Sequence, residues 1–150
     1  MNLKYAKRSE DTEQIKVINW ANCSIAKYQD LRWIFHPANG GSRNKAEAVK
    51  LKQMGVKPGV SDLNLPFPRG AYIGLYIEMK YGKNYPTKEQ IEFLTAMQEV
   101  GHLSIICYSA DAAIEVLERY LNLKAGELFD MDNLRCKSKK IDKYGLMRLE

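Results

Sequence analysis

The sequence predicts a single α/β domain, a mixed β-sheet flanked by helices, and three observations support this fold class. The chain has 150 residues, the usual size of one compact domain. Its hydrophobic fraction of 45% and charged fraction of 27% match globular proteins, which excludes a disordered or fibrous chain. Segments with helical and strand periodicity follow one another in the order α-β-α-β-β-α-β-α, which favours helices on both faces of a sheet.

The first part of the chain begins with a predicted helix whose N-cap is Ser9. Glu10 and Asp11 fill its first turn, and apolar residues follow at helical spacing. The segment 31–36 (L-R-W-I-F-H) is rich in aromatic and β-branched residues and stops at a proline, so we expect a short strand there. A second helix is predicted over 43–54, because a glycine follows at the usual stop position.

The middle of the chain predicts a β-hairpin. Residues 59–65 and 72–80 alternate apolar and polar side chains, and the turn-forming segment 66–70 (P-F-P-R-G) separates them. If the turn is centred on Gly70, residues that face each other across the strands have numbers that sum to about 140. This register places Asp62 opposite Glu78.

The second half of the chain predicts a helix, a buried strand and another helix. Thr87 and Gln90 have the spacing of a capping box, which starts a helix that ends near Gly101. The continuous apolar run 103–108 is typical of a strand that is covered on both faces. A last helix follows from Ser109 to about residue 123.

Periodicity fades after this helix. Residues 124–150 mix basic and acidic side chains around scattered apolar ones. We therefore expect a folded domain over residues 1–123 and a C-terminal tail over 124–150 that is loosely packed or depends on a partner.

The charge of the chain indicates a polyanionic partner, although weakly. The net charge is +5 and the sequence pI is about 9.0. Basic residues concentrate on the second predicted helix and the turn that follows it, where one acid accompanies Arg43, Lys45, Lys50, Lys52 and Lys57. This segment is a candidate phosphate-binding surface. A solvated helix face explains the charge equally well and stays open as the alternative.

The N-terminal sequence and the cysteines indicate a cytoplasmic protein. No apolar run is long enough to span a bilayer, and residues 1–14 contain no apolar core of a secretion signal. The three cysteines are far apart in sequence and lack metal-binding spacing, so we expect free thiols.

The predicted hairpin contains the candidate site. Two carboxylates directly opposite each other repel, so a cation should lie between Asp62 and Glu78. Mg²⁺ or Mn²⁺ suits these hard oxygen ligands and leaves positions for phosphate oxygens. Lys80, on the same face as Glu78, adds an ammonium, and the three residues together suit phosphodiester hydrolysis. The alternative is an edge strand with a solvated Glu-x-Lys salt bridge.

Four ordered motifs resemble those of stand-alone VRR-NUC domain proteins. They are F-H-P-A-N-G-G-S-R (35–43), G-V-K-P-G-V-S-D (55–62), I-E-M-K (77–80) and T-K-E-Q (87–90), and the resemblance covers about residues 9–121. Those proteins belong to the PD-(D/E)XK nuclease superfamily, and small members occur in bacteriophages and prophages. The resemblance implies the restriction-endonuclease-like sheet of that superfamily and a nuclease domain over residues 1–123.

The resemblance also implies roles for single residues. Asp62 matches the acid of the PD element, although Ser61 stands where the family has proline. Glu78 and Lys80 match the E-x-K element, and Met79 would supply a backbone carbonyl to the metal.

An acid of the first helix is the further ligand that the resemblance implies. Glu10, followed four residues later by Gln14, fits the family pattern, with Glu13 as a nearby competitor and an ordinary first-turn acid as the alternative. Gln90 matches a glutamine near the scissile phosphate, and its alternative role is the capping box. The resemblance places His36 away from the metal acids, which favours a positioning or packing role over general-base chemistry. The expected DNA contacts are Asn39, Gly40, Arg43, Lys45, Lys52, Lys57 and Lys83.

These features together predict a Mg²⁺- or Mn²⁺-dependent DNA endonuclease. By resemblance, the substrate would be branched DNA such as a four-way junction, cut by a homodimer inside a bacterial host cell, with a phage or prophage origin. Two alternatives stay open: a DNA-binding accessory protein that keeps the fold without turnover, and a nuclease for nicked or flap DNA.

Overall fold

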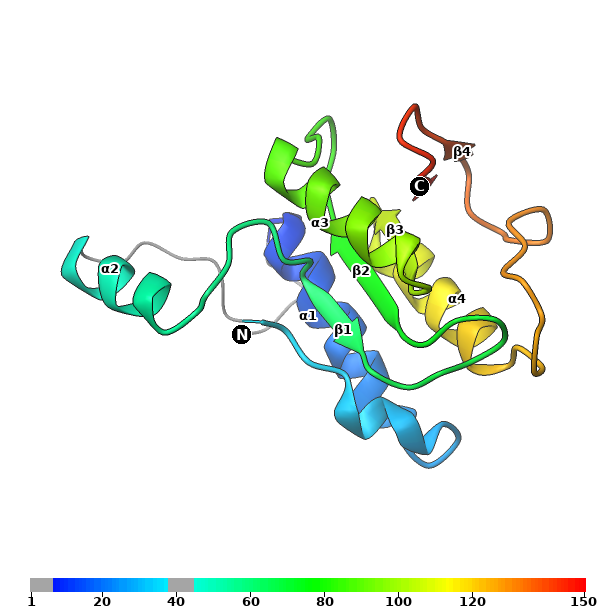
Figure 1. Ribbon diagram of the computed structural model, residues 1–150. Coiled ribbons are helices and arrows are strands. Elements are labelled where there is room, and N and C mark those ends of the chain that lie inside the picture. The colour runs from blue at the N-terminus through cyan, green and yellow to red at the C-terminus, as the bar shows by residue number, and fades with distance from the viewer. Residues whose placement is uncertain (1–6, 38–44) are drawn as a thin grey trace.

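The computed structural model describes residues 7–37 and 45–150, and its centre is a five-stranded mixed sheet (Figure 1). The strands are β1 (Leu63–Leu65), β2 (Leu75–Met79), β3 (Leu103–Cys107), β4 (Lys139–Ile141) and β5 (Met147–Leu149). They lie in the order β1-β2-β3-β5-β4. The β1–β2 and β4–β5 pairs are antiparallel, whereas β2, β3 and β5 run parallel to one another. The predicted mixed α/β sheet is confirmed.

Helices cover both faces of the sheet. The helices of the described residues are α1 (Glu10–Cys23), α2 (Lys45–Gln53), α3 (Lys88–Glu99) and α4 (Ala110–Leu121), of which α1, α3 and α4 pack on the sheet. Leu75, Ile77 and Met79 of β2 are buried in the core that the sheet shares with α1 and α4. Tyr76 points to the opposite face, where it packs edge-on against Phe93 of α3. The side chains of β2 therefore alternate as the sequence predicts.

The register of the hairpin is also confirmed. Leu63 pairs with Ile77 and Leu65 pairs with Leu75. Asp62, the residue before β1, is therefore level with Glu78. The turn brings the two acids together although they are 16 positions apart in sequence.

The segment 31–36 is not the predicted strand. Residues Gln29–Trp33 form a 3₁₀-helix, η1, and only one β-bridge follows, between Phe35 and Asn64. Leu31 is the buried residue of η1, while Trp33 and Phe35 are exposed. The aromatic composition of this segment favours a strand. Only the side chain of Leu31 is buried in η1, however, and a short helical turn is enough to bury one side chain.

The second predicted helix is present as α2, which stands apart from the sheet in Figure 1. None of its residues is buried. Gly55 follows it with φ of +97°, a conformation that suits glycine at a helix end. Of the expected DNA contacts, Asn39, Gly40 and Arg43 lie outside the described residues.

The expectation of a loosely packed tail over 124–150 is wrong. This segment supplies β4 and β5, and β5 pairs with the central strand β3. Phe129, Leu134, Leu146 and Leu149 are buried. The strands have only three residues each, which is too short for a periodic signal, and the burial of β5 depends on β3, which is distant in sequence. No helix in the described part of the chain is long and apolar enough to cross a membrane.

Because residues 124–150 are packed against the sheet, two leucines of this segment should differ in their contribution to stability. Leu146 is fully buried on the α3 face of the sheet, whereas Leu128 is 69% exposed. We expect Leu146→Ala to lower the free energy of unfolding by about 2–5 kcal/mol, because the cavity cannot collapse. Leu128→Ala should change it by less than about 0.5 kcal/mol. Urea denaturation of both variants measures this, and equal values would mean that residues 124–150 contribute little to the core.

Candidate active site

The candidate site lies where β2 ends and β1 begins. Glu78 and Lys80 lie at the carboxyl end of β2, and Asp62 is the residue immediately before β1. The backbone N–H of Met79 donates a 2.8 Å hydrogen bond to Asp62 Oδ2. The strand itself therefore holds the Asp62 carboxylate beside the E-x-K segment. The expected convergence of Asp62, Glu78 and Lys80 is present in the structure.

Glu78 is a fully buried carboxylate. Its Oε1 accepts a 2.7 Å hydrogen bond from Lys80 Nζ and another from Gln90 Nε2. Its Oε2 is buried with no hydrogen-bond partner among the described residues. Burial and the nearby Asp62 carboxylate raise the pKa of Glu78 to about 8, against the opposing effect of the Lys80 ammonium. The positive charge near Glu78 is therefore too small to stabilise the ionised form of this carboxyl group.

Lys80 is buried among three acids. Its Nζ lies 2.7 Å from Glu78 Oε1 and 3.7 Å from Glu10 Oε2. Burial lowers the pKa of Lys80, but Glu78, Glu10 and Asp62 together raise it above its usual value. The pKa of Asp62 is also raised, chiefly by burial. Lys80 is thus a fixed cation. Because Glu78 and Lys80 are both buried, the alternative interpretation of a solvated Glu-x-Lys salt bridge is excluded.

The two acids of α1 have different surroundings. Glu10 faces the site, where its Oε1 accepts a 2.9 Å hydrogen bond from Asn84 Nδ2. Glu13 points away into the core. It pairs with Arg8 at 2.9 Å and Lys16 at 2.7 Å, and it accepts a 2.9 Å bond from the N–H of Ala110 at the start of α4. The geometry therefore gives Glu10 the position near Lys80 and Glu13 a structural position.

Gln90 forms the capping box, one of the two roles that the sequence left as alternatives, and its side chain also contacts the candidate site. Its backbone N–H donates to Thr87 Oγ1, and its side-chain Oε1 accepts a 2.8 Å bond from the Thr87 N–H. This is the capping box of α3. The other end of the same amide donates to Glu78. The helix cap therefore fixes the amide that faces the Glu78 carboxylate.

The remaining predicted residues lie around this centre or on exposed surfaces. His36 Nδ1 is 2.6 Å from the backbone oxygen of Asp62, so the ring contacts the backbone of the site, not its carboxylate. This contact favours the positioning role. Lys45, Lys52, Lys57 and Lys83 are all exposed.

Asn84 is the site residue that sequence reasoning missed. It follows a tight turn in which Gly82 has φ of +62° and the Asn84 N–H donates to the Tyr81 oxygen. The G-K-N triplet after E-x-K predicts a turn, but nothing in it indicates that the asparagine reaches a helix 74 residues earlier in the chain.

The donor set of the site fits a hard divalent cation. Glu78 Oε2 is a buried oxygen that no described residue satisfies, and Asp62 and Glu10 add two carboxylates nearby. Within residues 7–37 and 45–150, no three His, Cys, Asp or Glu side chains are gathered as a finished metal cage. The Lys80 ammonium lies 2.7 Å from Glu78 Oε1 and 3.7 Å from Glu10 Oε2. Carboxylate oxygens are the ligands that Mg²⁺ prefers.

Comparison with solved structures gives a match to a protein of known domain type. A solved structure described as a VRR_NUC domain protein superposes on this chain with a TM-score of 0.69 at 31% sequence identity. The match covers 82% of this chain and 99% of the other. No model of a known protein family matches the sequence, and no curated protein does.

The different surroundings of Glu10 and Glu13 on α1 lead to a prediction of how the stability of the fold depends on pH. Burial alone would raise the pKa of Glu13, but hydrogen bonds from Arg8, Lys16 and Ala110 outweigh it and lower the pKa from 4.5 to about 2. Glu13 therefore stabilises the fold fully above pH 4.5, and this stabilisation is lost as the pH falls towards 2. Chemical denaturation should show that Glu13→Gln removes up to about 3 kcal/mol at pH 6 and much less at pH 2.5. Equal losses at both pH values would contradict the assignment.

Proposed function

The chain belongs to the family of VRR-NUC domain proteins, and we propose that it is a metal-dependent DNA endonuclease that cleaves branched DNA as a homodimer. Family membership supports a nuclease-type function. The observation that carries the finer proposal is the buried Glu78 carboxylate, with Asp62 opposite it and Lys80 beside it. Buried charges in this number are costly for folding, so a structural role alone does not account for them.

We assign Glu10, Asp62, Glu78 and the backbone carbonyl of Met79 as the ligands of Mg²⁺ or Mn²⁺. When bound, the metal lowers the pKa of a water and neutralises charge that develops on the phosphate. The described ligands are oxygen atoms only, which favours these hard cations over zinc. A divalent ion would also supply the positive charge that the raised pKa of Glu78 shows to be in deficit.

The other residues position the reacting groups. Lys80 Nζ has hydrogens left after its bond to Glu78, and we assign it to orient the attacking water and stabilise the developing negative charge. Gln90 holds Glu78 in place through the cap of α3. The Met79 N–H fixes one oxygen of Asp62, so the carboxylate needs no reorganisation when substrate arrives.

DNA would reach this site along a surface that includes α2 and the loop after β2. Lys45, Lys50 and Lys52 are exposed on α2, Lys57 follows it, and Lys83 lies beside the site. A four-way junction needs two symmetric cuts and each chain has one constellation of this kind among its described residues, which supports a homodimer. We place the protein in the cytoplasm of a bacterial host, with a phage or prophage origin.

A DNA-binding accessory protein without turnover is the less favoured function. Opposed carboxylates weaken the binding of a polyanion, so such a protein would have no use for Asp62 and Glu78 at this position. A nuclease for nicked or flap DNA would use the same chemistry, and a comparison of substrates separates it from the proposal.

The first test compares the cleavage of labelled four-way junction, flap and linear duplex, with Mg²⁺ or EDTA. We expect wild-type protein to cut the junction fastest and only with metal. Asp62→Asn and Lys80→Ala should each lose at least about 100-fold in rate, because each removes a group that contacts the reacting atoms. Glu92→Gln, an exposed acid on α3, is the matched control. Asp62→Asn cleaving at the wild-type rate would refute the site, and cleavage of no substrate would favour the accessory protein.

A second prediction concerns metal affinity and pH. The pKa of Glu78 is raised from 4.5 to about 8, so at neutral pH the metal must displace a proton from this carboxyl. The apparent Mg²⁺ affinity should therefore rise by up to about tenfold per pH unit between pH 6 and 8, and then level off. Calorimetry in buffers of different ionisation enthalpy should detect about one proton released at pH 7. Pure ligand binding without proton release would contradict the role of Glu78.

The basic helix gives a third prediction. Lys50→Gln with Lys52→Gln should reduce the slope of log K against log salt by about 2, because each phosphate contact contributes about 0.9. Lys140→Gln with Lys143→Gln is the charge-matched control, since both lysines are exposed at β4 and the turn after it, on the opposite edge of the sheet from β1. A slope that is equal in the two double variants would leave α2 as a solvated face.

A further inference from the structure

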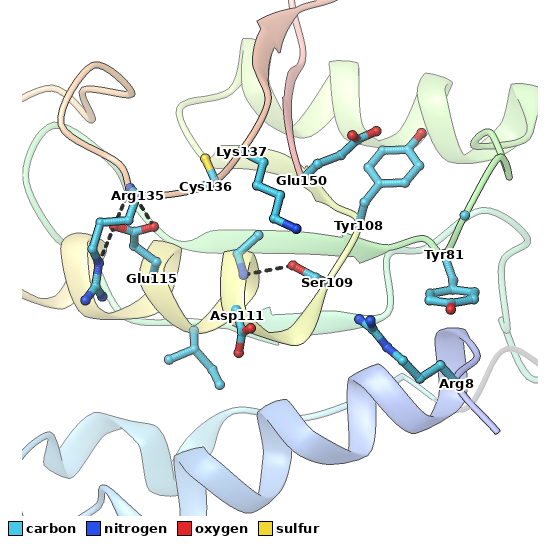
Figure 2. Close-up of a pocket in the computed structure, with 13 residues that line it drawn as sticks. Arg8, Tyr81, Tyr108, Ser109, Asp111, Glu115, Arg135, Cys136, Lys137 and Glu150 are labelled. Atoms are coloured by element: carbon cyan, nitrogen blue, oxygen red, sulfur yellow. Dashed lines mark hydrogen bonds and ion pairs between the residues drawn. The ribbon is translucent and has the colours of Figure 1, made fainter. Parts of the chain in front are cut away.

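The C-terminal edge of the sheet carries a second feature beside the candidate active site. A cavity of about 730 Å³ opens there, and Figure 2 shows its walls. Arg8 and Tyr81 form its lower rim in this view, while Tyr108, Lys137 and Glu150 form the upper rim. Its volume lies in the range of sites that bind small organic ligands. The catalytic assignments above use none of these residues.

Backbone pairing places this cavity directly beside the candidate active site. The N–H of Lys80 donates to the Cys107 oxygen at 2.8 Å, and the N–H of Tyr108 donates to the Leu149 oxygen at 2.8 Å. Lys80, Tyr108 and Glu150 therefore follow the ends of three adjacent parallel strands. Adjacent strands are about 4.8 Å apart. A DNA strand with its reacting phosphate at Lys80 would thus have its neighbouring nucleotide at the cavity.

The walls suit a nucleotide better than a stretch of duplex backbone. The positive charges of Arg8, Arg135 and Lys137 are balanced by Asp111, Glu115 and Glu150, so the cavity is not a basic groove. Two tyrosine side chains, Tyr81 and Tyr108, offer ring surfaces for a base.

The cations differ in their freedom to contact a phosphate. Arg135 is occupied by Glu115, which accepts bonds from its backbone N–H and its Nε. Arg8 pairs with Glu13 at 2.9 Å and its guanidinium lies 5.4 Å from the centre of the Tyr81 ring. In Figure 2 the Arg8 and Lys137 side chains extend towards the cavity from opposite sides, where they could contact one phosphate.

We infer that this cavity binds one unpaired nucleotide of the cleaved strand, next to the scissile phosphate, with its base against the ring of Tyr81. The inference rests on the proposed function and specifies its substrate. A base reaches such a cavity only after it leaves the stack and its partner, which costs a few kcal/mol. This cost is lower at the branch point of a junction, where stacking is interrupted, than inside a continuous duplex. The cavity is therefore a selectivity element for branched over linear DNA.

Tyr81 provides the sharpest test because the chain contains a matched control. Tyr144 is also partly exposed, and a cation, Lys143 Nζ, lies 5.0 Å from the centre of its ring. It belongs to the turn between β4 and β5, at the opposite end of the parallel strands. Tyr81→Ala thus removes a tyrosine side chain beside the cavity, and Tyr144→Ala removes the same type of side chain away from it. Lys137→Gln tests the other wall without touching the residue next to Lys80.

The experiment measures DNA binding in an Asp62→Asn background, where cleavage does not interfere, and cleavage in the wild-type background. The probes are a four-way junction and a linear duplex. In the junction, 2-aminopurine lies one nucleotide to either side of the cut. In the duplex, it lies at the equivalent positions of the same sequence. We expect a fluorescence change at one of these positions in the junction only. Tyr81→Ala should abolish it and weaken junction binding between about 5- and 100-fold, the usual effect of removing one stacked base contact.

The same experiment defines the outcomes that overturn the inference. Tyr81→Trp should restore junction binding to within about twofold of the parent, whereas Tyr144→Ala should leave it unchanged and Lys137→Gln should weaken it. Thermal unfolding of each variant checks its fold. If the wild-type chain cleaves junctions while Tyr81→Ala and Lys137→Gln behave like Tyr144→Ala, the cavity proposal fails and the proposed function stands. Equal weakening of junction and duplex binding also refutes an unpaired-nucleotide site. A failure to cleave any DNA refutes the function, independently of the fluorescence.

Discussion

The repulsion between two carboxylates across a β-hairpin is the constraint on which the site depends. Asp62 and Glu78 are level with each other because β1 and β2 pair with Leu63 opposite Ile77. Burial intensifies the repulsion, since a low-dielectric environment weakens charge screening. The chain opposes it with the Lys80 ammonium, the Gln90 amide and the Met79 N–H. These partners leave one oxygen of Glu78 unsatisfied, and a protein retains such a group at a cost in stability that function explains better than folding does.

The parallel part of the sheet determines which surfaces come together around this pair. Three parallel strands, β2, β3 and β5, end at one edge. Helix α1 begins at the same edge, so Glu10 of its first turn reaches Lys80. Helix α3 starts there as well, with Gln90 in its capping box. In open α/β sheets, ligands commonly bind outside the carboxyl ends of the strands, and the residues of the candidate site lie at that position.

Local patterns in the sequence predict much of this arrangement, and their failures have physical causes. The alternation along 72–80 and the turn before it define the register, which is why Asp62 and Glu78 could be paired from sequence alone. Short segments with non-local partners could not be predicted. The strand β5 has three residues and is buried only because β3 offers it an edge. Likewise, spacing alone did not separate Glu10 from Glu13, because the start of α4, which binds Glu13, is almost 100 positions away in sequence.

Gln90 shows how a helix start and a buried acid restrict one position together. The Thr87 N–H requires an acceptor, and the Glu78 carboxylate requires a donor that faces the other way. A glutamate would keep the cap but would turn a second negative charge towards Glu78. A leucine or methionine would fill a similar volume and leave both polar groups without a partner. The primary amide of glutamine is the side chain of this length that meets both demands, so a secondary-structure requirement and a chemical one select the same amino acid.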